Sequence, residues 1–177
     1  MRLKTLALLV LALLFIALVG CEHSIAFVNP AEKRRESIND LLSGDVIGDI
    51  GKSYTTRWFE FTVHSIDKAD AHLGYKAQED HLLYKVQVTL KSVWDDAIPM
   101  GTFDFYMDDT DFQEYIWAIP PLDNTMMPEE FIIQPGASVQ YLMVFEVPTG
   151  TTELALLYTE NNENGIDGKT FAIYIDS

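Results

Sequence analysis

Cysteine is almost absent from this sequence of 177 residues, in which Cys21 is the only one. A single thiol cannot close an intrachain disulfide, and it cannot by itself build a thiolate zinc site. The sequence therefore excludes both a disulfide-stapled scaffold and a zinc finger. It also leaves the lone thiol in need of an explanation of its own.

Basic residues are scarce. The chain has 12 Lys and Arg against 27 Asp and Glu, which gives a net charge of −15. No Lys or Arg occurs from Ser92 to Gly168, whereas fifteen acidic residues lie between Asp95 and Asp167. Nucleic-acid binding needs clustered positive charge to displace counterions, so this function is excluded. We interpret the acidic excess first as a solvated surface, although such a field also concentrates cations.

Long apolar runs are missing everywhere except at the start of the chain. Leu6 to Val19 is an unbroken apolar run of fourteen residues that follows Arg2 and Lys4. A secretory signal has a basic start and an apolar core of about 7 to 15 residues, whereas a membrane span needs about 20. The pattern therefore predicts a signal peptide over residues 1–20, and an uncleaved anchor is the alternative.

The apolar run ends in Leu18-Val19-Gly20-Cys21, which resembles the lipobox of bacterial lipoproteins. The resemblance implies cleavage between Gly20 and Cys21 and diacylation of the Cys21 sulfur. Two acyl chains suffice for stable membrane anchoring, whereas one is marginal. We therefore expect a protein tethered by lipid to the extracytoplasmic face of the cell membrane. Its mature net charge is −17, because Arg2 and Lys4 leave with the signal.

Residues 21–44 are predicted to form a lipidated tether with a short helix. Asn29 is a preferred N-cap residue and Pro30 suits the first helical position. Ile38, Leu41 and Leu42 follow helical spacing, and Gly44 is a natural stop.

From residue 45 onward the apolar residues alternate with period 2, which predicts strands without intervening helices. We expect an all-β domain over 45–177, an antiparallel immunoglobulin-like β-sandwich of seven to eight strands, with a closed barrel as the alternative. Within it, Phe103, Phe105 and Met107 are expected to share one face. Ser138–Val147, apolar on both faces, is expected to be a central strand after a type II turn at Gln134-Pro135-Gly136. The predicted strands are Arg57–Val63, Tyr84–Lys91, Thr102–Met107, Glu114–Ile119, Ser138–Val147, Glu153–Thr159 and Thr170–Ile175.

Several of these segments resemble an Ig-like domain-of-unknown-function family common in Gram-positive lipoproteins. The resemblance rests on Ile47-Gly48-Asp49, the Tyr84–Lys91 strand, Gln134-Pro135-Gly136 and Val144-Phe145-Glu146-Val147-Pro148. That family is related in fold to a mycobacterial immunoprotective extracellular antigen. The resemblance implies a fold and a location outside the cytoplasm, but it supplies no catalytic residue.

One acidic segment is a candidate cation site. Asp108, Asp109 and Asp111, with Glu114 close behind, offer the hard oxygen ligands that Ca²⁺ takes. The segment lacks the D-x-[DN]-x-[DN]-G pattern of a calcium loop, so a solvated acidic loop is the simpler interpretation. We therefore expect no cofactor and keep Ca²⁺ as the alternative.

No pattern indicates catalysis. The four histidines lack HExxH spacing, and there is no G-x-S-x-G segment. Trp58, on the polar side of its predicted strand, is the candidate ligand contact. We thus expect a non-enzymatic, lipid-anchored binding module for an unknown protein or cell-wall ligand. The alternative is an extracytoplasmic hydrolase or calcium-dependent accessory protein that uses Asp108 to Glu114.

Overall fold

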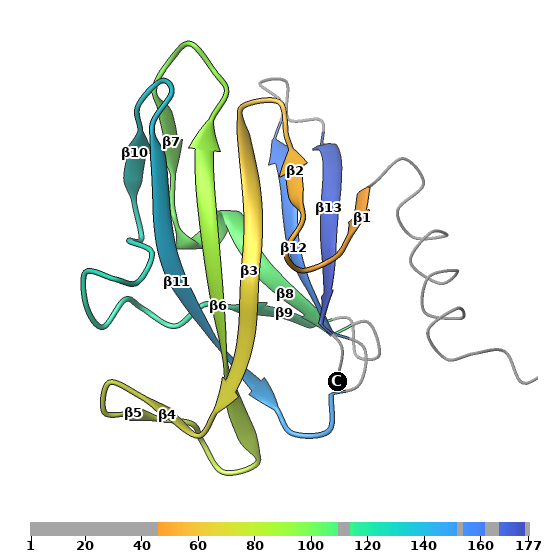
Figure 1. The fold of residues 1–177 in the computed structure, drawn as a ribbon. Coiled ribbons are helices and arrows are strands. Elements are labelled where there is room, and N and C mark those ends of the chain that lie inside the picture. Colours follow the sequence, from red (N-terminus) through yellow and green to blue (C-terminus); the bar gives the residue numbers. More distant parts are fainter. Residues whose placement is uncertain (1–45, 110–113, 152–153, 162–166, 176–177) are drawn as a thin grey trace, which may run out of the picture. The chain divides into compact units, whose positions relative to one another are not determined.

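The computed structural model describes residues 46–109, 114–151, 154–161 and 167–175, which form two β-sheets and two small strand pairs (Figure 1). One sheet has the order β1 (Val46–Gly48), β13 (Asp167–Ile175), β12 (Leu154–Asn161), β8 (Phe105–Asp109), β9 (Glu114–Trp117). The other has the order β11 (Ser138–Pro148), β6 (His81–Ser92), β3 (Phe59–Ala69), β2 (Ser53–Thr55). The small pairs are β10 (Phe131–Ile133) with β7 (Ile98–Met100), and β4 (Ala71–His72) with β5 (Tyr75–Lys76).

The inner faces of the two sheets enclose one aromatic core. The Phe61 ring of β3 lies 6.1 Å from Phe105 of β8 and 5.6 Å from Phe171 of β13, both edge-on. Phe59 meets Tyr158 of β12 at 4.9 Å. Burial of each such ring contributes about 1.5–3 kcal/mol, and edge-to-face pairs add to this. The alternating residues of the long strands therefore clamp the two sheets together as a sandwich, not as a closed barrel.

The expectation of an all-β fold is confirmed for the described residues, but the expectation that it is wholly antiparallel is wrong, because β1 pairs with β13 in parallel. Each of the seven predicted strands corresponds to a strand of four or more residues, namely β3, β6, β8, β9, β11, β12 and β13. Six further strands have two or three residues each, which is too short to leave an alternating pattern in the sequence. No helix in the described part of the chain is long and apolar enough to cross a membrane.

The predicted strand Thr102–Met107 begins later than expected. Thr102–Asp104 form a single 3₁₀ turn (η1), and β8 starts only at Phe105. The turn breaks the alternation, so Phe105 and Met107 are buried whereas Phe103 is 60% exposed. The expectation that Phe103 shares their face is therefore wrong.

The expectation that Ser138–Val147 is a central strand is also wrong, because β11 lies at the edge of its sheet. Its outer edge is covered by the segment 118–127, in which the Ile119 N–H donates to the Val144 carbonyl at 2.8 Å. The Leu142 N–H in turn donates to the Thr125 carbonyl at 3.0 Å. The second apolar face packs in a small cluster made of Leu83, Ile119, Met126 and Val144. A covered edge strand and a central strand thus have the same sequence pattern.

The type II turn before β11 is confirmed. The Ala137 N–H donates to the Gln134 carbonyl at 2.9 Å, and Gly136 has a φ of 68°, the left-handed conformation that glycine tolerates. The signal peptide over 1–20, the cleavage site at Gly20 and Cys21, and the helix within 21–44 lie outside the described residues.

Candidate binding site

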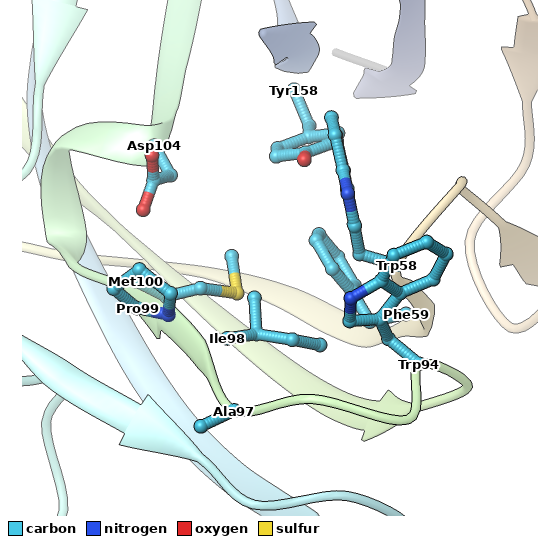
Figure 2. A pocket seen from close by; sticks show the side chains of 9 residues that line it. All are labelled: Trp58, Phe59, Trp94, Ala97, Ile98, Pro99, Met100, Asp104 and Tyr158. Carbon is cyan, nitrogen blue, oxygen red and sulfur yellow. The ribbon is translucent and has the colours of Figure 1, made fainter. Parts of the chain in front are cut away.

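A pocket of about 270 Å³ opens at one end of the sandwich, beside the β7 strand. We call it the tryptophan pocket. It is lined by Trp58, Phe59, Trp94, Ala97, Ile98, Pro99, Met100, Asp104 and Tyr158. Four of these side chains are aromatic, and Asp104 is the single charged one. Figure 2 shows Asp104 on one side of the pocket and the two indoles on the other.

Two buried hydroxyl groups hold the tryptophan-bearing turns. Thr56 Oγ1 accepts hydrogen bonds from the Trp58 N–H at 3.2 Å and the Phe59 N–H at 3.0 Å. Ser92 Oγ accepts from the Trp94 N–H at 3.3 Å and donates to the Trp94 carbonyl at 3.1 Å. Short polar side chains favour such local turns. In both turns, a hydroxyl oxygen thus accepts from the backbone N–H of the tryptophan two residues later.

The two turns are also joined to each other. The Val93 N–H donates to the Trp58 carbonyl at 3.0 Å, and Phe59 pairs with Ser92 in the β3–β6 register. The Arg57 guanidinium lies 5.7 Å from the Trp58 ring centroid and 5.9 Å from that of Trp94, within cation–π range. Arg57 contacts both indoles but is not among the residues that line the tryptophan pocket.

Glu160 secures this region from the other sheet. Its carboxylate is buried and accepts hydrogen bonds from the Arg57 N–H at 2.8 Å and the Lys169 N–H at 3.3 Å. Gly168 makes this contact possible, because a Cβ there would lie 2.6 Å from the Glu160 Cβ. Glu160 is therefore engaged as an acceptor for backbone groups.

Asp104 occupies the last position of η1. Its Oδ2 accepts a hydrogen bond from the Gly101 N–H at 2.7 Å. Burial raises the pKa of Asp104, and the hydrogen bond from Gly101 opposes this only in part. Burial also raises the pKa of Tyr158, and the charges of Asp104 and Glu160 add to that rise. The Tyr158 hydroxyl consequently remains neutral across the physiological pH range.

An open groove of about 680 Å³ continues from the tryptophan pocket. Pro99, Met100 and Asp104 line both spaces. Phe103 and Ile132, 60% and 59% exposed, line the groove with Glu129 and Glu130. The pocket therefore opens onto an acidic surface with exposed apolar side chains.

Trp58 is the one predicted contact residue that the structure places in this site. Sequence reasoning missed Asp104 and Tyr158, and it weighed Trp94 as an outward-facing ring without singling it out. A signal for Trp94 was present, because Thr56-Arg57-Trp58 and Ser92-Val93-Trp94 share the spacing hydroxyl-x-Trp. No comparable signal marks Asp104, because its role depends on the turn that delays β8.

The candidate calcium residues lie on the β8–β9 hairpin instead. Asp109 pairs with Glu114 in the register of that hairpin, Asp108 is half-buried on β8, and Asp111 lies outside the described residues. Among the residues that the structure describes, no three His, Cys, Asp or Glu side chains are grouped as a metal site. Calcium binding there stays a prediction.

No protein-family model matches the sequence, and no curated protein is significantly similar to it. Solved structures do share its fold. The candidate lipoprotein ycdA from Bacillus subtilis is 20% identical with a TM-score of 0.56, over 70% of this chain and 38% of that chain. The secreted protein MPT63 from Mycobacterium tuberculosis is 13% identical with a TM-score of 0.52, over 72% of this chain and 97% of that chain.

An uncharacterized β-sandwich protein from Clostridium difficile is 13% identical with a TM-score of 0.50, over 75% of this chain and 95% of that chain. At these identities the likeness shows the fold alone. The chain spans 38% of the length of ycdA. A β-sandwich shared with lipoprotein and secreted neighbours is consistent with the Ig-like resemblance of the sequence.

Proposed function

We propose that this protein is a lipid-anchored, extracytoplasmic binding module that takes its ligand in the tryptophan pocket and performs no catalysis. The observation that carries the proposal is the pocket itself, in which two indoles lie across from one carboxylate. Small-molecule sites are typically apolar and aromatic with few polar groups that fix orientation. The tryptophan pocket has this composition.

The chemistry of the lining supports binding over hydrolysis. Asp104 and Tyr158 are the only lining side chains that exchange a proton, and the raised pKa of Tyr158 keeps its hydroxyl neutral. A hydrolase of the glycosidase type needs a second carboxylate across the scissile bond. Glu160, an acid in the same region, already accepts from the N–H groups of Arg57 and Lys169.

The proposed anchor is the diacylated Cys21, after removal of residues 1–20. Support comes from the short apolar run that ends at Gly20-Cys21, and from a fold shared with a candidate lipoprotein. An Ig-like domain on such a tether stands outside the cytoplasm, where its pocket meets cell-wall components, secreted proteins or small solutes.

Lipid anchoring is tested by replacing Cys21→Ser and fractionating cells. We expect the wild-type protein in the envelope fraction, with an N-terminal peptide that starts at Cys21 and carries a lipid mass. The variant is expected to lose both. Ser24→Ala, a neighbouring substitution that keeps the thiol, is expected to behave as wild type. A Cys21→Ser protein that resists washing from envelopes as firmly as wild type contradicts the anchor.

Binding in the pocket is tested by tryptophan fluorescence. The chain has three tryptophans, so Trp117→Phe leaves only the two that line the pocket. We expect small molecules extracted from the cell envelope to change this emission in a saturable way, and Trp94→Ala to abolish the change. If no fraction gives a saturable response, or if Trp94→Ala responds equally, the pocket is not the binding site.

A further inference from the structure

We infer that the tryptophan pocket recognises a small organic cation, with its ammonium group against the Asp104 carboxylate and its carbon atoms against the rings of Trp58 and Trp94. This inference rests on the proposed function and names the class of ligand. It follows from the charge of the lining, from the aromatic walls and from the surrounding field.

The Asp104 carboxylate has acceptor capacity to spare. A carboxylate offers about four acceptor positions, and among the described residues its one hydrogen-bond partner is the Gly101 N–H. The carboxylate is partly withdrawn from water, as its raised pKa reflects. No cation lies among the residues that line the pocket. A ligand that brings a positive charge therefore compensates Asp104, whereas an anion is repelled by it.

The opposite wall suits the same ligand. Indole rings attract cations through their quadrupole, most strongly when water is excluded. The Arg57 guanidinium at 5.7 and 5.9 Å from the two ring centroids shows that this pair of rings already contacts a cation within the chain. Quaternary and alkyl ammonium groups combine a positive charge with an apolar surface, which matches a wall of Trp58, Trp94 and Met100 beside one carboxylate.

The field around the pocket favours entry of cations. The segment Ser92–Gly168, which supplies most of the lining, holds no Lys or Arg. Asp95 and Asp96 are exposed between Trp94 and the β7 strand, and Glu129 and Glu130 line the adjoining groove. These four acidic residues outweigh the single positive charge of the nearby Arg57, so the charge around the pocket is negative. Acidic clefts raise the local concentration of positive ligands.

The size and polarity of the pocket argue against a sugar as the occupant. A volume of about 270 Å³ lies below the usual range of about 300–1,000 Å³ for ligand pockets, so the ligand is small. A sugar stacks on indole but also needs partners for several hydroxyl groups. Besides Asp104 and the aromatic residues, the lining consists of Ala97, Ile98, Pro99 and Met100, whose side chains carry no hydrogen-bonding group for a hydroxyl.

The test compares choline with its uncharged carbon analogue, 3,3-dimethylbutan-1-ol. The two have nearly the same shape and differ in the charge. Each is titrated at neutral pH into the detergent-solubilised full-length protein, and binding is followed by calorimetry and tryptophan fluorescence. We expect saturable binding of choline and binding of the neutral analogue that is weaker by about tenfold or more, the change that loss of one charge-assisted contact gives.

Asp104→Asn is the decisive variant, because its amide oxygen can still accept from the Gly101 N–H. We expect choline affinity to fall about tenfold or more, with binding of the neutral analogue unchanged. Asp67→Asn, an exposed acid elsewhere on β3, is the matched control and is expected to bind choline as wild type. An unchanged circular dichroism spectrum and a cooperative melting transition establish that each variant is folded.

A further titration with n-butylammonium identifies the chemical class of the cation. If n-butylammonium binds more tightly than choline, the natural ligand resembles a lysine side chain or a free amine, and the reverse order indicates a methylated headgroup. The inference is overturned if both choline and n-butylammonium fail to bind, if the neutral analogue binds as tightly as choline, or if Asp104→Asn leaves choline affinity unchanged. If only an uncharged envelope component binds saturably, the inference of a cationic ligand is wrong, but the proposed binding function of the pocket is supported.

Discussion

At the scale of single residues, the Thr56 hydroxyl is the group on which the geometry of Trp58 depends. Replacing Thr56→Ala leaves the N–H groups of Trp58 and Phe59 without their acceptor in a buried turn. We expect a loss of about 1–3 kcal/mol in the free energy of unfolding, measured in urea, because an unsatisfied buried donor carries a desolvation penalty of that size. Thr56→Ser keeps the hydroxyl and should restore most of the loss. Equal unfolding midpoints for the two variants would show that the hydroxyl does not hold the turn.

Asp104 gives a prediction about pH. Its pKa in the folded protein is raised above its ordinary value of 3.8, so the folded state holds the proton more tightly than the unfolded state. Protonation of Asp104 therefore contributes fully to the free energy of unfolding below pH 3.8. This contribution is lost as the pH rises through the raised pKa of the folded protein. The Asp104→Asn variant does not show this loss, because its side chain does not titrate. We expect its stability relative to wild type to increase with pH over that window, and a difference that is constant or falls with pH contradicts the burial of Asp104.

At the scale of elements, the segment 118–127 that covers the edge of β11 depends on Asp123. Asp123 Oδ1 accepts from the Thr125 N–H at 2.9 Å and the Thr125 hydroxyl at 2.7 Å. These hydrogen bonds hold the pKa of Asp123 below its ordinary value. We expect Asp123→Ala to loosen the segment and to speed hydrogen exchange at the Leu142 amide, which donates to the Thr125 carbonyl.

Asp123→Asn keeps an acceptor oxygen and is the control, for which we expect exchange at Leu142 close to that of wild type. If the alanine and asparagine variants exchange at the same rate, the turn at Asp123 does not secure the edge of β11.

Elements whose side chains alternate were predictable from the sequence, since burial on one face leaves a period of two. Most of the seven longer strands were recovered for this reason, whereas β11, apolar on both faces, was recognised by its β-branched and aromatic residues. The turn at Gln134–Gly136 was recognised by its Pro-Gly pair. The three-residue strands β7 and β10 and the turn η1 were not, because they are defined by contacts between distant segments. The pocket depends on these elements, so only Trp58 among its lining was predicted. Trp94 was within reach through the spacing that it shares with Trp58, whereas Asp104 required the turn itself.

For the molecule as a whole, the acidic excess gives a prediction about calcium. If the acids are a solvated surface, the melting temperature in millimolar Ca²⁺ and in chelator should coincide once ionic strength is matched. A specific site would instead raise the melting temperature with Ca²⁺ concentration, because a ligand that binds only the folded state stabilises it by mass action. In that case Asp108→Asn should abolish the rise, and Asp67→Asn, on the other sheet, should not.

The parallel pairing of β1 with β13 bears on a protein held to a surface by its amino-terminal side. Val46, Ile47 and Gly48 pair with Phe171, Ala172 and Ile173, and β1 has no other neighbour in its sheet. If the chain is anchored through Cys21 as proposed, β1 is the first described strand that a pulling force along the backbone meets. Under such a force we expect β1 to separate from β13 before the other strands separate from one another. The tryptophan pocket should then keep its shape, because no residue of β1 lines it.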